Sequence, residues 1–164
     1  MKEIQLTKNQ TTIVDDEDYD FLSQWKWFAV FMPPSNRPYA CRNEWDFENK
    51  RRIRKFMHRE LLGLSKEDKR VGDHINLDTL DNRGSNLRAA TRSQNMANMG
   101  LRKDNTSGLK GVVRRSGNYD KPWIAQIGIG LLPKNLGVFA TKEEAYEAYR
   151  KAAISAFGEF ARVS

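Results

Sequence analysis

The strongest constraint on the fold lies in residues 71–99, where the residue pattern changes three times over a short distance, from one type of secondary structure to the next. The short run VGDHI, which we interpret as a strand, is followed by NLDTLDNRGS, which is rich in turn formers, and by a second short strand-like run, NLRAA. In the stretch TRSQNMANM that comes next, Thr91 can cap a helix, and Gln94, three residues later, completes a capping box. The pattern therefore predicts a strand, a loop, a second strand and a helix, with the two strands forming a hairpin.

Short aromatic and β-branched runs predict further strands on both sides of this segment. Before it, we expect strands at residues 3–7, 11–15, 25–31, 38–45 and 51–57, a helix at 16–25 and a short helix of one or two turns at 58–63. After a polar linker at residues 99–107, we expect strands at 109–115, 123–129 and 135–139 and a helix at 141–157. That helix has a capping box at Thr141 and Glu144, and its narrow packing face is formed by Ala145, Tyr149, Ala152 and Ala156. The order of elements predicts an α+β protein.

The charge of the chain indicates a polyanionic partner. The net charge is +7. Residues 1–41 carry −2, residues 42–99 carry +4 and residues 100–164 carry +5. A basic surface attracts nucleic acid, which is the commonest polyanion inside a cell, although a solvated surface rich in lysine would have the same charge.

Composition excludes several classes of protein. No apolar run approaches the roughly 20 residues that a membrane-spanning helix needs, and the start of the chain, MKEIQLTKNQ, lacks an apolar signal region. Cys41 is the single cysteine, so a disulfide within the chain is impossible and a cysteine-ligated structural zinc site is disfavoured. We therefore expect a cytoplasmic protein with no membrane partner.

Three polar residues of the 71–99 segment suit the hydrolysis of phosphodiester bonds. Asp73 offers a carboxylate and Asn95 an amide oxygen, which together could hold a hard cation such as Mg²⁺, or alternatively Mn²⁺, in an open site. His74, with an ordinary pKa near 6.5, could take a proton from water. Adjacent strand residues point to opposite faces, so Asp73 and His74 would have to flank a phosphate from two sides.

The same residues resemble the HNH nuclease motif, also called the ββα-metal fold. The resemblance rests on DHIN, NLR and SQN, and it covers residues 73–95. It implies that His74 is the general base, that Asp73 and Asn95 bind metal, and that Asn86 braces the loop. Many members have histidine where this chain has Asn95, and the amide favours Mg²⁺ or Mn²⁺ over zinc.

Residues 108–163 resemble a second family, the Apetala-type or ethylene-response-factor DNA-binding domain. The resemblance rests on SGLKGVVRR, WIAQI, NLGVFATKEEAYEAYRKAA and FGEFAR. It implies three antiparallel strands packed on one helix, with the sheet entering the major groove of DNA. Val113 stands where plant members place an arginine, so their target sequence cannot be carried over. A nuclease motif followed by such a domain is the layout of phage and intron-encoded homing endonucleases.

The two resemblances predict an HNH nuclease unit at residues 1–98 with an N-terminal β-rich extension, a linker at 99–107 and a DNA-binding domain at 108–164. Strand alternation in the second domain turns Val112, Trp123, Ala125, Ile127 and Leu136 toward the helix, and Val113, Arg115, Ile124, Gln126 and Gly128 outward. Arg115 and Gln126 are candidates for contacts with base edges. The expected contacts with the DNA backbone are Lys110, Arg114 and Lys134, together with Arg83, Arg88 and Arg92 around the motif.

Each assignment has a structural alternative. His74 could be a buried polar residue with no catalytic role, Asp73 a turn cap and Asn95 part of a helix surface. His58 could be a cap or packing residue, or it could contact phosphate. At the level of function, a site-specific, metal-dependent homing endonuclease competes with a DNA-binding regulator that does not cleave and with an RNA-binding protein. As an endonuclease, a monomer or weak dimer would act on double-stranded DNA, with one nick for each active site.

Overall fold

The computed structural model describes residues 1–33, 35–129 and 132–163. The chain divides into two compact units, Met1–Thr91 and Arg92–Ser164. Helices and small antiparallel sheets occur in both units, so the predicted α+β class is confirmed. Among the described residues, no helix is long and apolar enough to cross a membrane.

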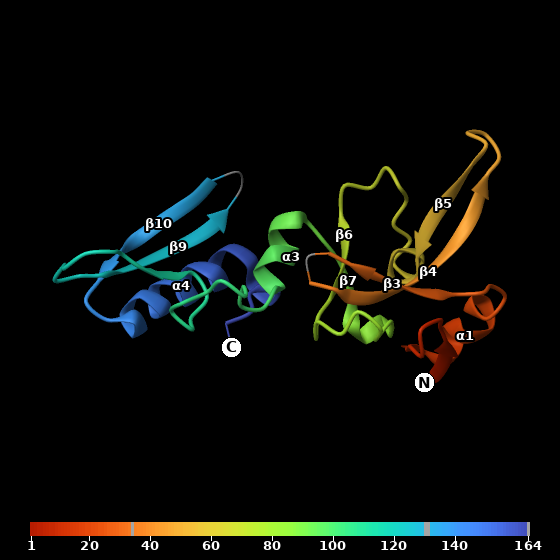
Figure 1. Cartoon of the computed structure of the whole chain (residues 1–164), viewed down its shortest axis with the longest axis horizontal. Helices are drawn as coiled ribbons and strands as arrows, with labels where there is room; N and C mark the ends of the chain where they lie inside the picture. Colours follow the sequence, from red (N-terminus) through yellow and green to blue (C-terminus); the bar gives the residue numbers. More distant parts are fainter. Residues whose placement is uncertain (34, 130–131, 164) are drawn as a thin grey trace. The chain divides into compact units, whose positions relative to one another are not determined.

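In its described residues, the first unit contains three small sheets and two short α-helices (Figure 1). A hairpin of β1 (Lys2–Gln5) and β2 (Thr11–Val14) is followed by α1 (Asp16–Leu22). The strands β3 (Phe28–Met32), β4 (Arg37–Asp46) and β5 (Arg51–Phe56) form an antiparallel sheet, from which the β4–β5 hairpin extends as a long arm. After α2 (Met57–Leu61), β6 (Val71–His74) pairs with β7 (Leu87–Ala90) across a loop that contains a 3₁₀ turn at Gly84–Asn86.

The core of the first unit joins residues that are far apart in the sequence. Val14, Leu22 and Met57 are fully buried, and Trp27 lies among them with its indole nitrogen donating to the carbonyl of Leu22 at 2.8 Å. Burial of these apolar side chains is the main favourable contribution to folding. It holds β2 and α2 in one cluster, and both elements contribute side chains to the site described below.

The second unit contains α3 (Arg92–Asn98), β8 (Val112–Arg114), β9 (Trp123–Ile129), β10 (Leu132–Phe139) and α4 (Lys142–Phe157), with a last 3₁₀ turn at Gly158–Phe160. The strand β9 lies at the centre of an antiparallel three-stranded sheet, and α4 packs on one face of that sheet (Figure 1). The predicted alternation is confirmed, because Val112, Ala125 and Ile127 are buried toward α4 while Gln126 and Gly128 are exposed.

The predicted packing face of α4 needs one correction. The capping box at Thr141 and Glu144 is present, and Ala145 and Tyr149 are buried as expected. The third buried residue is Ala153, whereas Ala152 is only partly buried and Ala156 is exposed. Steps of four residues keep side chains on one face of a helix, so the seam that begins at Ala145 and Tyr149 continues to Ala153.

Candidate active site

The strand β6 ends with the two residues that the motif singled out. Asp73 is 3% exposed and His74 is 5% exposed. Asp73 stands opposite Arg88 on β7, and His74 stands opposite Leu87. Because paired residues share a face of a sheet, Asp73 and Arg88 lie on one face and His74 on the other, as the strand period requires.

The carboxylate of Asp73 is held by an ion pair. The guanidinium Nε of Arg88 lies 2.8 Å from Asp73 Oδ2, and both side chains are largely buried. Arg88 was predicted to contact the DNA backbone, and that role remains a prediction. In the structure, the guanidinium gives the buried carboxylate a partner for its charge and fixes its orientation.

A chain of hydrogen bonds orients the imidazole of His74. The hydroxyl of Thr12 donates to the carbonyl of Leu80 at 2.7 Å, so its oxygen accepts from Nδ2 of Asn82, also at 2.7 Å. The amide oxygen of Asn82 is thereby turned toward His74, and it lies 3.2 Å from Nε2. An amide oxygen can only accept, so neutral His74 carries its hydrogen on Nε2 and its basic lone pair on Nδ1.

A second histidine packs against His74. The rings of His58 and His74 lie 5.1 Å apart, and Tyr39 contacts both rings. His58 is buried, which confirms its interpretation as a packing residue and places it beside the motif. A Cβ at Gly72 would lie 2.3 Å from Cδ2 of His58, so the ring can take this position only because residue 72 is glycine.

Burial keeps both imidazoles neutral. It lowers the pKa of His58 to about 3, with smaller contributions from the nearby His74 and Arg59. Burial also lowers the pKa of His74, and it outweighs the opposing effects of the Asn82 hydrogen bond and of the acids Asp73, Asp78 and Asp81. A neutral imidazole at physiological pH is the form that can accept a proton.

Asn86 ties the loop between β6 and β7 at two points. Its amide oxygen accepts from the backbone N–H of Asn76 at 2.9 Å, and its Nδ2 donates to the carbonyl of Asp81 at 2.7 Å. A loop-bracing role, predicted for this residue, requires bonds of this kind. Arg83, predicted to contact DNA, donates to both carboxylate oxygens of Asp81 at 2.7 and 2.6 Å and lowers the pKa of that acid.

The residues that orient His74 were not among the predicted site residues. Thr12 lies on β2, and the loop reaches this strand through two backbone bonds, from Asn82 N to Ile13 O at 2.8 Å and from Ile13 N to Leu80 O at 2.9 Å. Thr12 and Asn82 are separated by 70 residues, so no local pattern relates them. The one local indication of such residues was the high content of Asn and Asp in NLDTLDNRGS, a composition typical of a tightly hydrogen-bonded loop.

The helix α3 carries the other predicted ligand and belongs to the second unit. Asn95 is partly buried and Arg92 is exposed. The helix packs within this unit because Arg162 donates to the carbonyl of Asn98 at 3.0 Å and the ammonium of Lys110 donates to the carbonyls of Ala97 and Met99. The compact units therefore divide before α3, whereas the predicted functional boundary follows it. Metal binding by Asn95 remains a prediction.

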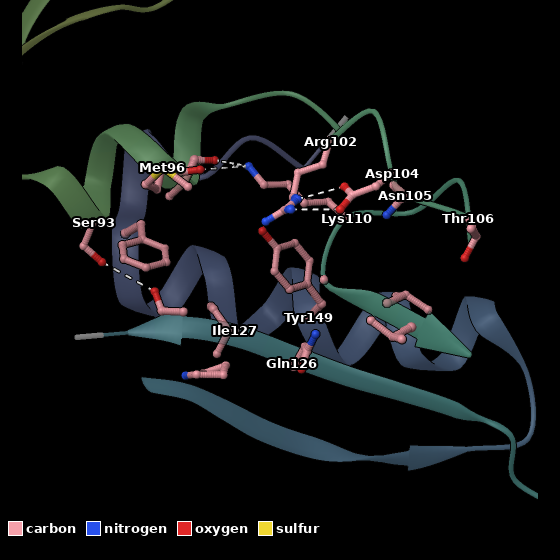
Figure 2. Close-up of a pocket in the computed structure, with 17 residues that line it drawn as sticks. Ser93, Met96, Arg102, Asp104, Asn105, Thr106, Lys110, Gln126, Ile127 and Tyr149 are labelled. Atoms are coloured by element: carbon pink, nitrogen blue, oxygen red, sulfur yellow. Dashed lines mark hydrogen bonds and ion pairs between the residues drawn. The ribbon is translucent and has the colours of Figure 1, made fainter. Parts of the chain in front are cut away.

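Lys110 and its surroundings line a cavity of about 450 Å³ in the second unit (Figure 2). Figure 2 shows the ammonium of Lys110 directed at the carbonyl groups at the end of α3, and Arg102 paired with Asp104. Burial lowers the pKa of Lys110 to about 8. This ammonium caps a helix, which gives Lys110 a structural role besides the phosphate contact predicted for it.

The remaining predicted DNA contacts of the second unit lie on the strands of its sheet or directly after them. Arg114, Gln126 and Lys134 are exposed, and Gln126 faces away from α4. Arg115 is partly buried, with its guanidinium 3.9 Å from the centre of the Tyr119 ring. This position limits the rotamers of Arg115 and leaves its planar face against an aromatic ring.

The donor set for a metal is sparse. Within the described parts of the chain, no group of three or more His, Cys, Asp or Glu side chains could hold a metal ion. The predicted site combines one carboxylate with one amide, which is a different donor set. Hard divalent cations are often held by one or two carboxylates plus substrate phosphates. Asp73, fixed by Arg88, fits that requirement for one carboxylate.

A buried carboxylate and a neutral, oriented imidazole on opposite faces at the end of one short strand could flank a phosphate, an arrangement suited to metal-assisted hydrolysis. Comparison with known proteins indicates a nuclease. Residues 67–97 match the family model described as HNH endonuclease. The chain is also 40% identical, over 89 residues, to an uncharacterized HNH endonuclease, L560, of Acanthamoeba polyphaga mimivirus. That match covers 54% of this chain, and the chain spans 44% of the length of the viral protein. Both matches support the prediction of a nuclease.

Proposed function

We propose that the protein is a metal-dependent DNA endonuclease that hydrolyses phosphodiester bonds at the end of β6. The observation that carries the proposal is the Thr12–Asn82–His74 chain, which fixes the tautomer of the imidazole within the segment that matches HNH endonucleases. The neighbouring carboxylate, Asp73, supplies the second chemical group.

In this mechanism, Nδ1 of His74 accepts a proton from a water molecule. The water oxygen forms a bond to phosphorus, the bond from phosphorus to the leaving oxygen breaks, and the leaving oxygen takes a proton from solvent. Asp73 and Asn95 would hold Mg²⁺, or alternatively Mn²⁺, which stabilises negative charge on the phosphate and on the leaving oxygen. Arg88 keeps the Asp73 carboxylate in place, and Asn82 keeps His74 in the reactive tautomer.

The finer assignments are part of the same proposal. Residues 108–164 act as an Apetala-type DNA-binding domain, in which Arg115 and Gln126 read bases. The residues assigned to the DNA backbone are Lys110, Arg114, Lys134, Arg83, Arg88 and Arg92. The enzyme acts as a site-specific, homing-type endonuclease in the cytoplasm of a bacterial or phage-infected cell. A monomer makes one nick for each active site.

One observation favours the alternative of a DNA-binding regulator that does not cleave. The Asp73–Arg88 ion pair already neutralises the carboxylate that the nuclease needs for its cation. If this pair persisted in the DNA complex, the protein could bind DNA without hydrolysing it. The two functions therefore differ in one measurable property, the dependence of DNA cleavage on a divalent cation.

Plasmid nicking tests the proposal. Purified protein is incubated with supercoiled plasmid in Mg²⁺ or in chelator, and a matched RNA substrate is incubated in parallel. We expect nicking of DNA that requires the cation and that is lost in His74→Ala, while DNA binding persists in the same variant. Cleavage retained in His74→Ala would contradict the assignment of the base. Binding of DNA with no nicking under any condition would favour the regulator.

A further inference from the structure

The β4–β5 hairpin separates its charged residues between its two faces. Trp45 pairs with Arg52 across the hairpin, and Asn43 pairs with Arg54. Paired residues share a face, and so do residues two apart on one strand. One face, called here the exposed hairpin face, therefore carries Asn43, Trp45, Arg52 and Arg54. The opposite face carries Arg42, Glu44, Asp46, Arg51, Ile53 and Lys55.

The charges of the opposite face are compensated. Arg42 pairs with Glu44 and with Glu60, each at 2.7 Å, and its guanidinium lies 4.4 Å from the centre of the Trp25 ring. Lys55 lies 3.9 Å from Glu44, and Arg51 lies 3.8 Å from Asp46. These contacts serve folding, because each basic group is matched by an acid of the same unit.

The exposed hairpin face has the same kinds of basic residue but no acid. Arg52 and Arg54 are exposed, and neither forms an ion pair with the acids that the structure describes. Trp45 is 46% exposed and stands directly opposite Arg52, nearer the tip of the hairpin than Arg54. Two exposed arginines and a half-exposed indole therefore share one surface. Such a set is complementary to nucleic acid, since guanidinium groups bind phosphates and an indole stacks on bases.

The exposed hairpin face is continuous with the candidate active site. Toward the base of the hairpin, the same face carries Tyr39 and Phe56, whose rings are 6.1 Å apart. The ring of Tyr39 also lies 6.1 Å from that of His74. Arg54 and Arg52 follow Phe56 at intervals of two residues, or about 7 Å along an extended strand. A DNA strand that leaves His74 along this face would meet the two arginines in succession.

We infer that the exposed hairpin face binds the DNA strand next to the phosphate that is cleaved. Arg54 and Arg52 contact successive parts of its backbone, and Trp45 stacks on an exposed base or sugar near the tip. This inference rests on the function proposed above only in taking DNA as the substrate. It adds a DNA-binding face on the β4–β5 hairpin to the contacts proposed for Arg83, Arg88 and Arg92 and for residues 108–164.

The hairpin offers a matched control for the experiment. The full-length double variant Arg52→Gln/Arg54→Gln is compared with Arg51→Gln/Lys55→Gln, which removes the same charge from the opposite face. Binding of a fluorescent DNA duplex is measured by anisotropy in chelator over a series of salt concentrations. We expect the first variant to bind about tenfold more weakly than the control. Its plot of log affinity against log salt should be flatter by about 2, because each phosphate contact contributes roughly 0.9 to that slope.

The outcomes separate this inference from the proposed function. Equal affinities and slopes for the two double variants would overturn the inference. A difference between the variants would support it even if the wild-type protein cut no DNA, in which case only the nuclease proposal would fail. Thermal unfolding verifies that all variants fold. Trp45→Ala and Trp45→Phe provide a further readout, since phenylalanine should retain part of the affinity that alanine loses.

Discussion

Replacing Gly72 by alanine tests whether the packing of His58 sets the position of His74. The added Cβ would lie 2.3 Å from Cδ2 of His58, whereas ordinary contacts begin at 3.4 Å, so the ring must move by about 1 Å. It cannot move freely, because the rings of Tyr39, Phe56 and His74 lie 5.1 to 5.6 Å from it. We expect overpacking to lower the free energy of unfolding by about 1–3 kcal/mol.

The same displacement should reduce catalysis. Because His58 is in contact with His74, a shift of about 1 Å is passed on to the proposed base, and a misplacement of that size can lower a rate by about 100-fold. The assays are chemical denaturation for stability and plasmid nicking for rate. DNA binding in chelator should stay near the wild-type value, which would separate the effect on kcat from an effect on affinity.

Two further variants sharpen the test. Gly128→Ala is a matched control, because a Cβ there meets no atom within 4 Å, and its stability should change by less than about 0.5 kcal/mol. The double variant Gly72→Ala/His58→Ala removes the ring that clashes, so the two substitutions should show a coupling energy of about 1 kcal/mol or more. Additive effects, or a Gly72→Ala variant with wild-type stability and activity, would refute the reasoning.

Three other predictions follow from the structure. Thr12→Val leaves Nδ2 of Asn82 without its acceptor, so it should lower the free energy of unfolding by about 1–3 kcal/mol and also lower kcat. Thr12→Ser keeps the acceptor and should retain both stability and kcat. Equal nicking rates for the two variants would contradict the proposed hydrogen-bond chain. Burial raises the pKa of the Cys41 thiol from 9.0 to about 12. The folded state therefore keeps a proton that the unfolded state loses, and stability should fall as pH rises from 9 toward 12, with a smaller fall in Cys41→Ala measured by denaturation over that range. Thr141→Ala removes the cap that accepts from Glu144 N and should destabilise the second unit by about 1 kcal/mol; an unchanged melting temperature would show that this cap adds nothing.

Much of the secondary structure could be predicted because its causes are local. The alternation in β8 and β9 follows from the period of a strand, and the start of α4 follows from the capping box at Thr141. The error at Ala156 arose where two neighbouring helical faces were both rich in alanine, and only packing against the sheet decided between them.

The candidate site was predictable only in part. Asp73 and His74 could be identified because they adjoin in the sequence and stand in a known motif, and Asn86 lies close enough to brace the same loop. The partners that give these residues their properties come from other elements. Arg88 reaches Asp73 through strand pairing, and Thr12 reaches His74 through Asn82 and a contact between β2 and the loop.

The sequence alone determined the order of strands and helices, the basic charge and the residues able to perform acid–base chemistry, since all three follow from residue type and spacing. The tertiary structure decided which ring nitrogen of His74 carries the basic lone pair and why residue 72 must be glycine. It also decided which of the described arginines form no ion pair with a described acid. Those properties depend on distances between segments that are remote in the chain. Such distances are set by the burial of a shared core, which no local pattern records.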